Sequence, residues 1–177
     1  MDTETTIRVA CFAGVLAVMM LCERLSPRRT LTVTRALRWF GNLVIVVIDS
    51  VVVRVVFQAM AAVGVAHWAR EHGWGLFNVV GAPTWLAVAA TVVLFDLLIY
   101  AQHVLFHAMP VLWRFHRMHH ADTDIDATTG VRFHPVEIVI SMGIKCSAVL
   151  ALGAPPMGVI VFEVLLNATA MFNHANL

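Results

Sequence analysis

The sequence predicts an all-α integral membrane bundle of about four to five membrane helices that carries a cytoplasmic, histidine-rich metal site. Of the 177 residues, 60% are hydrophobic and only 13% are charged. The mean hydropathy of +0.82 lies above that of soluble domains. Six of the nine histidines fall between positions 103 and 134. Because the length is that of one domain, we treat residues 1–177 as a single membrane domain.

The first two apolar stretches predict two membrane spans. The first, residues 9–22, is short for a bilayer whose core takes about 20 helical residues. We expect it to be retained in the mature protein, because no positively charged signal region precedes it. The second runs from position 39 to about 66. Its polar residues are expected to face protein or water, and they are Asp49, Arg54 and Gln58.

The third and fourth stretches predict the helices nearest the histidines. The third is uncharged over residues 73–95 and continues as a helical pattern to His107, with Pro83 at a helix start. The fourth, residues 136–172, is interrupted by Gly153-Ala154-Pro155-Pro156. Since proline and glycine stop helices, this stretch predicts a hairpin of two helices.

The distribution of arginines predicts the orientation. The loop between the first two stretches carries five arginines against one glutamate, so the positive-inside rule places it in the cytoplasm. Counting crossings from there puts His67 and His72 on the far side and the 103–134 cluster in the cytoplasm. The hairpin returns His174 to the same face. The membrane would be the inner membrane of a bacterium or the endoplasmic reticulum of a eukaryote.

Composition excludes several classes of function. The net charge is +1 and there is no basic tract, so nucleic acid is not an expected partner. The three cysteines have no CxxC spacing, which argues against disulfides and thiolate metal sites. The chain has no room for a reductase or cytochrome module, so any electrons must come from a separate donor, of ferredoxin or cytochrome type.

The histidines fall into two groups with helical spacing. In the first, intervals of 4, 3 and 4 place four side chains on one face of the third helix: Asp96, Tyr100, His103 and His107. An HxxxH pair can bind a metal ion, although alone it also fits interfacial histidines at the end of a membrane helix. Pro110 then breaks the helix. The second group lies at i, i+3 and i+4 on the next segment and comprises His116, His119 and His120.

Five clustered imidazoles predict metal binding. They would repel one another if protonated and cost desolvation free energy if buried. Imidazole suits iron, zinc, copper and nickel, whereas magnesium and calcium prefer oxygen ligands. Because five histidines exceed the four ligands of one tetrahedral zinc, we expect two metal ions with positions open for oxygen. Ligand type alone does not separate iron from zinc.

Four segments together resemble the fatty acid hydroxylase/sterol desaturase superfamily of membrane di-iron oxygenases. They are residues 96–107, residues 112–122, Arg132-Phe-His134-Pro135-Val-Glu137 and Phe172-Asn173-His174-Ala-Asn176. The resemblance covers roughly residues 85–177, and residues 1–84 are similar only in being hydrophobic membrane helices. It implies two iron ions, with zinc as a possible substitute, molecular oxygen, and hydroxylation or desaturation of a fatty acyl chain, sterol or carotenoid.

The resemblance also implies the metal ligands. His103 and His107 match the first histidine box of the family, and His116, His119 and His120 match the second. His174 matches a further ligand before the third box, and no catalytic residue is expected beyond the ligands. A third HxxHH is absent because the chain stops three residues after His174. We therefore expect the chain as given to be an incomplete enzyme that holds fewer than two irons.

The remaining polar residues have less specific interpretations. His134 is a ligand or, more in keeping with its place at a helix start, a substrate-side group. Asp96 and Tyr100 orient the ligand imidazoles or are ordinary interfacial residues. Asn173 and Asn176 cap the returning helix or form hydrogen bonds within the site. The acidic residues at 122, 124 and 126 lack the glycine and glutamate of a calcium loop, which predicts a solvated loop. The five tryptophans are interfacial anchors without a catalytic role.

Two other classes of function remain open. In a haem-binding electron carrier, His103 and His116 would be the axial ligands, but Pro110 interrupts the helix that such a pair needs. A divalent-metal transporter should carry ionisable residues at mid-membrane on several helices, and here only Asp49 and Arg54 lie deep in a stretch. The oxygenase hypothesis requires a lipid substrate, O2, a separate electron donor and membrane lipids. The sequence does not identify the substrate.

Overall fold

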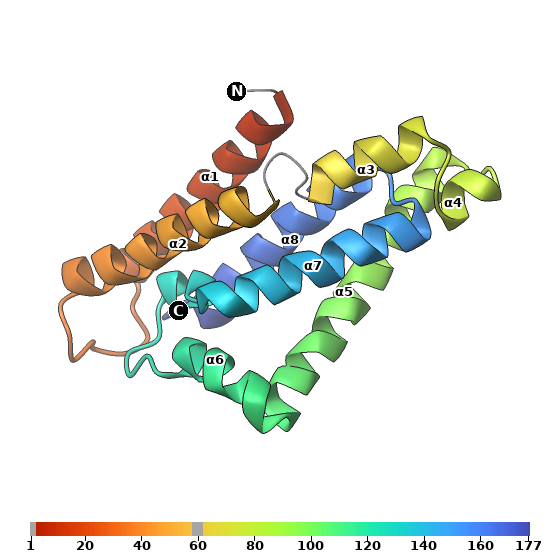
Figure 1. The fold of residues 1–177 in the computed structure, drawn as a ribbon. Coiled ribbons are helices and arrows are strands. Elements are labelled where there is room, and N and C mark those ends of the chain that lie inside the picture. Colours follow the sequence, from red (N-terminus) through yellow and green to blue (C-terminus); the bar gives the residue numbers. More distant parts are fainter. Residues whose placement is uncertain (1–2, 58–61) are drawn as a thin grey trace.

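A computed structural model describes residues 3–57 and 62–177 of the chain. Within these ranges it contains α-helices, one 3-10 helix and no strand (Figure 1). The elements are α1 (Thr3–Leu25), α2 (Arg35–Phe57), α3 (Ala62–Glu71), α4 (Leu76–Val79), α5 (Thr84–Ala108), α6 (Pro110–His120), η1 (Ala127–Val131), α7 (Pro135–Leu152) and α8 (Pro156–His174).

Five helical segments are long and apolar enough to cross a membrane: α1, a stretch that begins with α2, α5, α7 and α8. The prediction of an all-α membrane bundle is thereby confirmed. The first span is longer than the expected residues 9–22, because α1 includes charged residues at both of its ends. These residues have partners, since Arg8 forms an ion pair with Glu163 of α8 and Glu23 accepts backbone N–H groups.

The second and third stretches differ in part from their predictions. Asp49 of α2 is buried as expected, whereas Arg54 is exposed and Gln58 lies outside the described residues. The apolar residues 73–83 precede the predicted helix start, and Gly73, Gly75 and Gly81 adopt positive φ angles there that most side chains disfavour. The short α4 and turns occupy this segment, and α5 begins directly after Pro83, as predicted.

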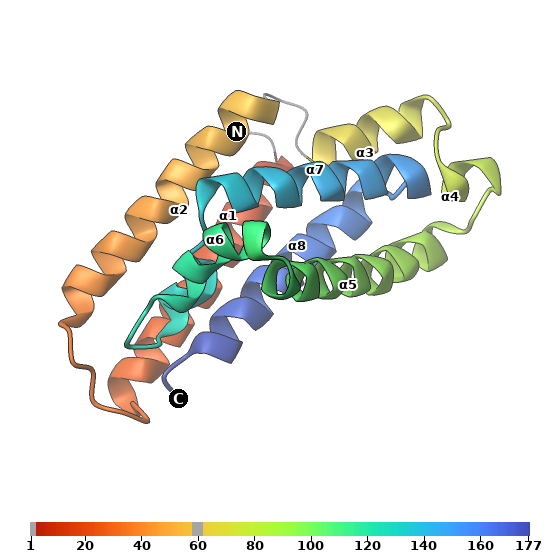
Figure 2. The same cartoon turned by 60° about the horizontal axis from the view of Figure 1, so that its bottom comes forward.

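The predicted C-terminal hairpin is confirmed, and its second helix is central to the bundle. Gly153 takes a left-handed conformation after α7, and α8 then runs back to pack against α1, α3, α5 and η1. Phe95 of α5 and Phe162 of α8 meet edge to face with ring centroids 5.3 Å apart. As the N-terminal and C-terminal ends of α8 lie at opposite ends of the bundle (Figures 1 and 2), the hairpin carries His174 to the end occupied by α6.

The orientation prediction can be tested by labelling single cysteines. After replacement of the native cysteines, Glu71→Cys and Thr123→Cys should react with an impermeant thiol reagent from opposite sides, with position 123 cytoplasmic, because an odd number of crossings separates them. Both residues are exposed. Thr123 is preferable to Asp122, whose side chain is paired with Arg38. Labelling of both positions from one side would contradict the crossing count.

Candidate metal centre

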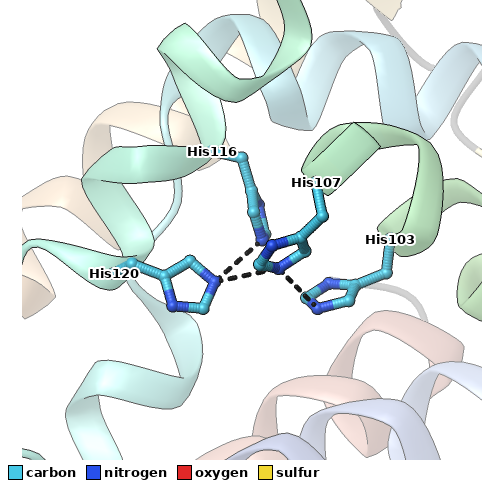
Figure 3. A group of neighbouring side chains, drawn as sticks. All are labelled: His103, His107, His116 and His120. Carbon is cyan, nitrogen blue, oxygen red and sulfur yellow. Dashed lines mark hydrogen bonds between the residues drawn. The ribbon is translucent and has the colours of Figure 1, made fainter. Parts of the chain in front are cut away.

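A sharp corner between α5 and α6 brings the two histidine groups together. α5 ends at Ala108 and α6 begins at Pro110, so that Met109 alone forms the connection, in an extended conformation. Proline disfavours helical geometry in the residue before it but suits the first position of a helix. The chain therefore turns at Met109, and the histidine side chains of α6 point towards those of α5 (Figure 3).

Four imidazoles converge at this corner (Figure 3). One ring nitrogen from each lies within 4.8 Å of the others, and they belong to His103, His107, His116 and His120. The Nε2 atom of His107 is 3.1 Å from Nε2 of His103 and from Nε2 of His120. Metal–nitrogen bonds of about 2.1 Å at right angles would separate neighbouring ligand nitrogens by about 3 Å. The spacing therefore fits ligands of one ion.

A buried carboxylate orients one of the four rings. Nδ1 of His116 lies 2.7 Å from Oε1 of Glu137, and both side chains are almost completely buried. Nδ1–H donates to the carboxylate and leaves Nε2 unprotonated towards the cluster, 3.2 Å from Nε2 of His120. A carboxylate in this position also raises the basicity of the imidazole. Sequence reasoning missed Glu137 as a site residue, although it lies in the His134-Pro135-Val-Glu137 segment.

His119 and His174 form a second pair beside the four. Their Nε2 atoms lie 3.0 Å apart, although 55 residues separate them in sequence. The opposite nitrogen of each ring donates to a backbone carbonyl, that of Arg132 for His119 and that of Ala170 for His174. Both Nε2 atoms are thus left with a lone pair, and the predicted approach of His174 to the cluster is present in the structure.

Burial keeps His119 and His120 neutral. Desolvation, reinforced by the neighbouring His174, lowers the pKa of His119 to about 3, against a smaller opposing effect of the Arg132 carbonyl. Desolvation also lowers the pKa of His120, and the nearby His116 adds to this effect. At neutral pH these imidazoles carry free lone pairs, as metal ligation requires.

The acidic loop after α6, which contains Asp122, Asp124 and Asp126, is held against α2, and its prediction as a solvated loop is wrong. The guanidinium of Arg38 donates to Asp122 and Asp126, and all three side chains are buried. Burial opposes ionisation of Asp122, but hydrogen bonds from Arg38 and Thr129 outweigh it and lower the pKa of the carboxyl group. The pairing has a physical reason, because a buried guanidinium needs a compensating charge.

The connection between α1 and α2 holds the same loop by further hydrogen bonds. Asp124 accepts from the backbone N–H groups of Thr32 and Val33. The carboxylate of Glu23 accepts from the N–H groups of Ala127 and Asn176. This loop leads to Arg132, whose backbone carbonyl orients His119. Residues that are distant from the histidines in sequence therefore help to fix the orientation of one candidate ligand.

The asparagines of the C-terminal segment lie outside the cluster. Asn176 neither caps α8 nor reaches the histidines, because its side chain bonds the backbone of Arg29. Asn173 is exposed. Asp96 and Tyr100 are exposed as well, and neither forms a hydrogen bond with an imidazole among the described residues.

Two further aromatic side chains, His134 and Trp113, contact residues of α6. His134 caps α7 by accepting from the Val136 N–H, and its ring lies 5.1 Å from that of Phe115. Trp113 packs against His107 and His120, with centroid distances of 5.4 and 5.6 Å. It is therefore more than the interfacial anchor that the sequence suggested.

The two histidines outside the site have other partners, since His67 contacts Glu4 and His72 contacts Trp68.

Comparison with known proteins gives a family match: residues 88–177 fit the family described as "Fatty acid hydroxylase". No curated protein and no solved structure matches the chain. The match spans half of the chain and contains every histidine of the cluster, the Glu137 carboxylate and His174. The chain therefore belongs to the fatty acid hydroxylase family.

Proposed function

We propose that the protein is an O2-dependent, non-haem di-iron oxygenase that hydroxylates or desaturates a lipid. The observation that carries this proposal is the convergence of four imidazole nitrogens within 4.8 Å in a member of the fatty acid hydroxylase family. Haem would use two axial histidines rather than four converging ones. The cluster gathers at one end of the bundle, which disfavours a transport pathway through it.

The donor set fits iron. The cluster consists of imidazole nitrogens, and where the second nitrogen of a ring is bonded, it donates to a carbonyl or carboxylate oxygen. His103, His107, His116 and His120 would hold one ion, and His119 and His174 would contribute to a second. When bound, iron supplies the activation of O2 that removal of a hydrogen from an aliphatic carbon requires.

The protein itself would orient the ligands and admit the substrate. Glu137 and the Arg132 and Ala170 carbonyls fix the rings so that Nε2 remains free for the metal. An open cavity of about 280 Å³ borders His107 and is otherwise lined by Ala108, Pro110 and Trp113. These neighbours are apolar, and the helix that bears His107 is a candidate membrane span. An acyl chain could therefore approach from the bilayer and pack against Trp113.

The test is oxygen-dependent turnover by membranes that contain the product of the complete gene, because the 177 residues alone are expected to hold fewer than two irons. Membranes loaded with ferrous iron and supplied with a chemical reductant should form hydroxylated or desaturated lipid in air and none under argon, as read by mass spectrometry. His72→Ala is the matched control, since this histidine lies outside the cluster. Lack of oxygen-dependent product together with a Soret absorbance band, or with metal uptake into vesicles, would instead favour the electron carrier or the transporter.

Glu137→Gln should weaken metal binding without unfolding the bundle. The amide keeps the shape of the side chain but can present its NH2 group to His116 and favour the wrong tautomer. Loss of such an outer hydrogen bond typically lowers metal affinity about 10–100-fold. Iron or zinc titration of the purified chain would measure this. Asp96→Asn, on the helix of His103 but without contact to an imidazole, should leave affinity unchanged, and equal effects of the two variants would contradict the assignment.

A further inference from the structure

The end of α1 and the start of α2, on either side of their connection, line a positively charged cavity that the metal centre does not use. This cavity, of about 320 Å³, is lined by Arg24, Arg35, Ala36 and Trp39. Arg24 lies in the last turn of α1, and Arg35 is the first residue of α2. Because α1 and the stretch that begins with α2 are both candidate membrane spans, the cavity lies at the level where such spans emerge from the bilayer.

Two of the three polar groups around this cavity have no acceptor among the described residues. Arg24 is exposed and forms no hydrogen bond or ion pair with another described residue. The indole Nε1 of Trp39 is buried and has no partner among the described residues, although an indole N–H is a donor that is normally satisfied when buried. The Arg35 guanidinium is held in place by donating to the Glu23 carbonyl, at 2.8 Å. An occupant must therefore supply acceptors and negative charge.

The surrounding surface favours a lipid over a free anion. Guanidinium groups bind phosphate oxygens through paired hydrogen bonds, and tryptophan is enriched at the depth of the lipid headgroups. Leu37 and Phe40, next to the cavity-lining residues of α2, are 64% and 71% exposed. These apolar side chains offer a surface along which acyl chains can pack below a bound headgroup.

We propose that this cavity binds the phosphate of an anionic phospholipid, held by Arg24 and Arg35 with the Trp39 N–H as a further donor. An anionic lipid is favoured over a zwitterionic one, because the lining carries two arginines and no carboxylate that could pair with a choline cation. The site is separate from the histidine cluster, so the inference does not depend on the oxygenase activity.

Binding of fluorescent phosphatidylglycerol to the full chain in phosphatidylcholine nanodiscs would test the proposal. Arg24→Gln should weaken binding about fivefold, the effect expected for one cation near a lipid surface. Trp39→Phe keeps the ring but removes the donor and should also weaken binding. Arg28→Gln is the matched control, because it removes the same charge from an exposed position of the same connection outside the lining. Arg35 is not varied, since it also holds the Glu23 carbonyl.

Three results would overturn the proposal. Equal weakening by Arg28→Gln and Arg24→Gln would show diffuse attraction by the arginines rather than a site. Equal affinity for fluorescent phosphatidylcholine would remove the requirement for an anionic headgroup. Displacement of the lipid by millimolar inorganic phosphate would show that the cavity binds a free anion and that the acyl chains contribute nothing.

Discussion

Replacing His107 by alanine should abolish lipid oxidation and remove most of the bound metal. Its Nε2 atom lies 3.1 Å from the Nε2 atoms of both His103 and His120, so it links ligands from two helices. Loss of a ligand should lower metal affinity by more than the 10–100-fold that is typical for loss of a hydrogen bond to a ligand. Metal content of the purified chain and lipid product in membranes would measure the two effects.

The same loss of product is expected for alanine at each other histidine of the two boxes, namely His103, His116, His119 and His120. Membrane insertion should be retained, because the apolar spans are unchanged. His72→Ala should behave as the unaltered chain, since its ring contacts Trp68 of α3 and no histidine of the cluster among the described residues. Near-normal product from two or more of the box variants would contradict the assignment of these residues as ligands.

Arg38→Met should destabilise the folded protein by about 3–5 kcal/mol, because it leaves the buried carboxylate of Asp126 without a cation and that of Asp122 with only Arg132, 4.0 Å away. Asp122 and Asp126 both accept hydrogen bonds from this guanidinium. For a protein of this size, each 1 kcal/mol shifts the thermal midpoint by roughly 2–4 °C. Thermal unfolding in detergent, followed by circular dichroism, would show the decrease.

Two further variants distinguish the stability lost with the ion pair from the stability lost on any substitution of an arginine in α2. Arg54→Met removes an exposed arginine from the same helix and should have little effect. The triple change Arg38→Met, Asp122→Asn and Asp126→Asn removes cation and carboxylates together, and it should recover most of the lost stability. If the triple variant is no more stable than Arg38→Met alone, the loss does not come from unpaired buried charge.

The ion pair also has an expected pH dependence. The pKa of Asp122 is lowered in the folded protein, so its stabilising contribution is complete above the unfolded value of about 3.9 and is lost as pH falls through the folded value. The unaltered chain should therefore lose this contribution only in strong acid. In Arg38→Met, burial without the guanidinium raises the pKa of the carboxyl group, so as pH falls the variant should regain stability, beginning at a higher pH, and the difference between the two should shrink.

Local spacing predicted much of the site, because a helix has a fixed period. Intervals of three and four residues placed His116 and His120 on one face, and Pro110 marked the end of the preceding helix. The α7–α8 hairpin followed from the glycine and prolines at 153–156. In each case the physical cause lies within a few residues of the feature it produces.

Partners that are distant in sequence were not predictable in this way. Arg38 and Asp126 are 88 residues apart, and no spacing rule connects a loop carboxylate to a particular arginine. The arginine was interpreted only as a topological signal, and the loop only by its failure to match a calcium motif. Glu137 was missed for a related reason, because its role appears only when α7 is seen packed beside α6.

Because Met109 alone joins α5 to α6, the metal centre depends on how α6 is rotated about its own axis. An α-helix turns about 100° per residue, so one residue inserted in α6 between Pro110 and His116 would rotate His116 and His120 away from the rings of α5, however well each helix folded. Residues 73–83, which join α3 to α5 through short turns, face no such constraint from the cluster. Length variation in this fold should therefore be tolerated at the end of the bundle opposite the metal centre and forbidden between the two histidine boxes.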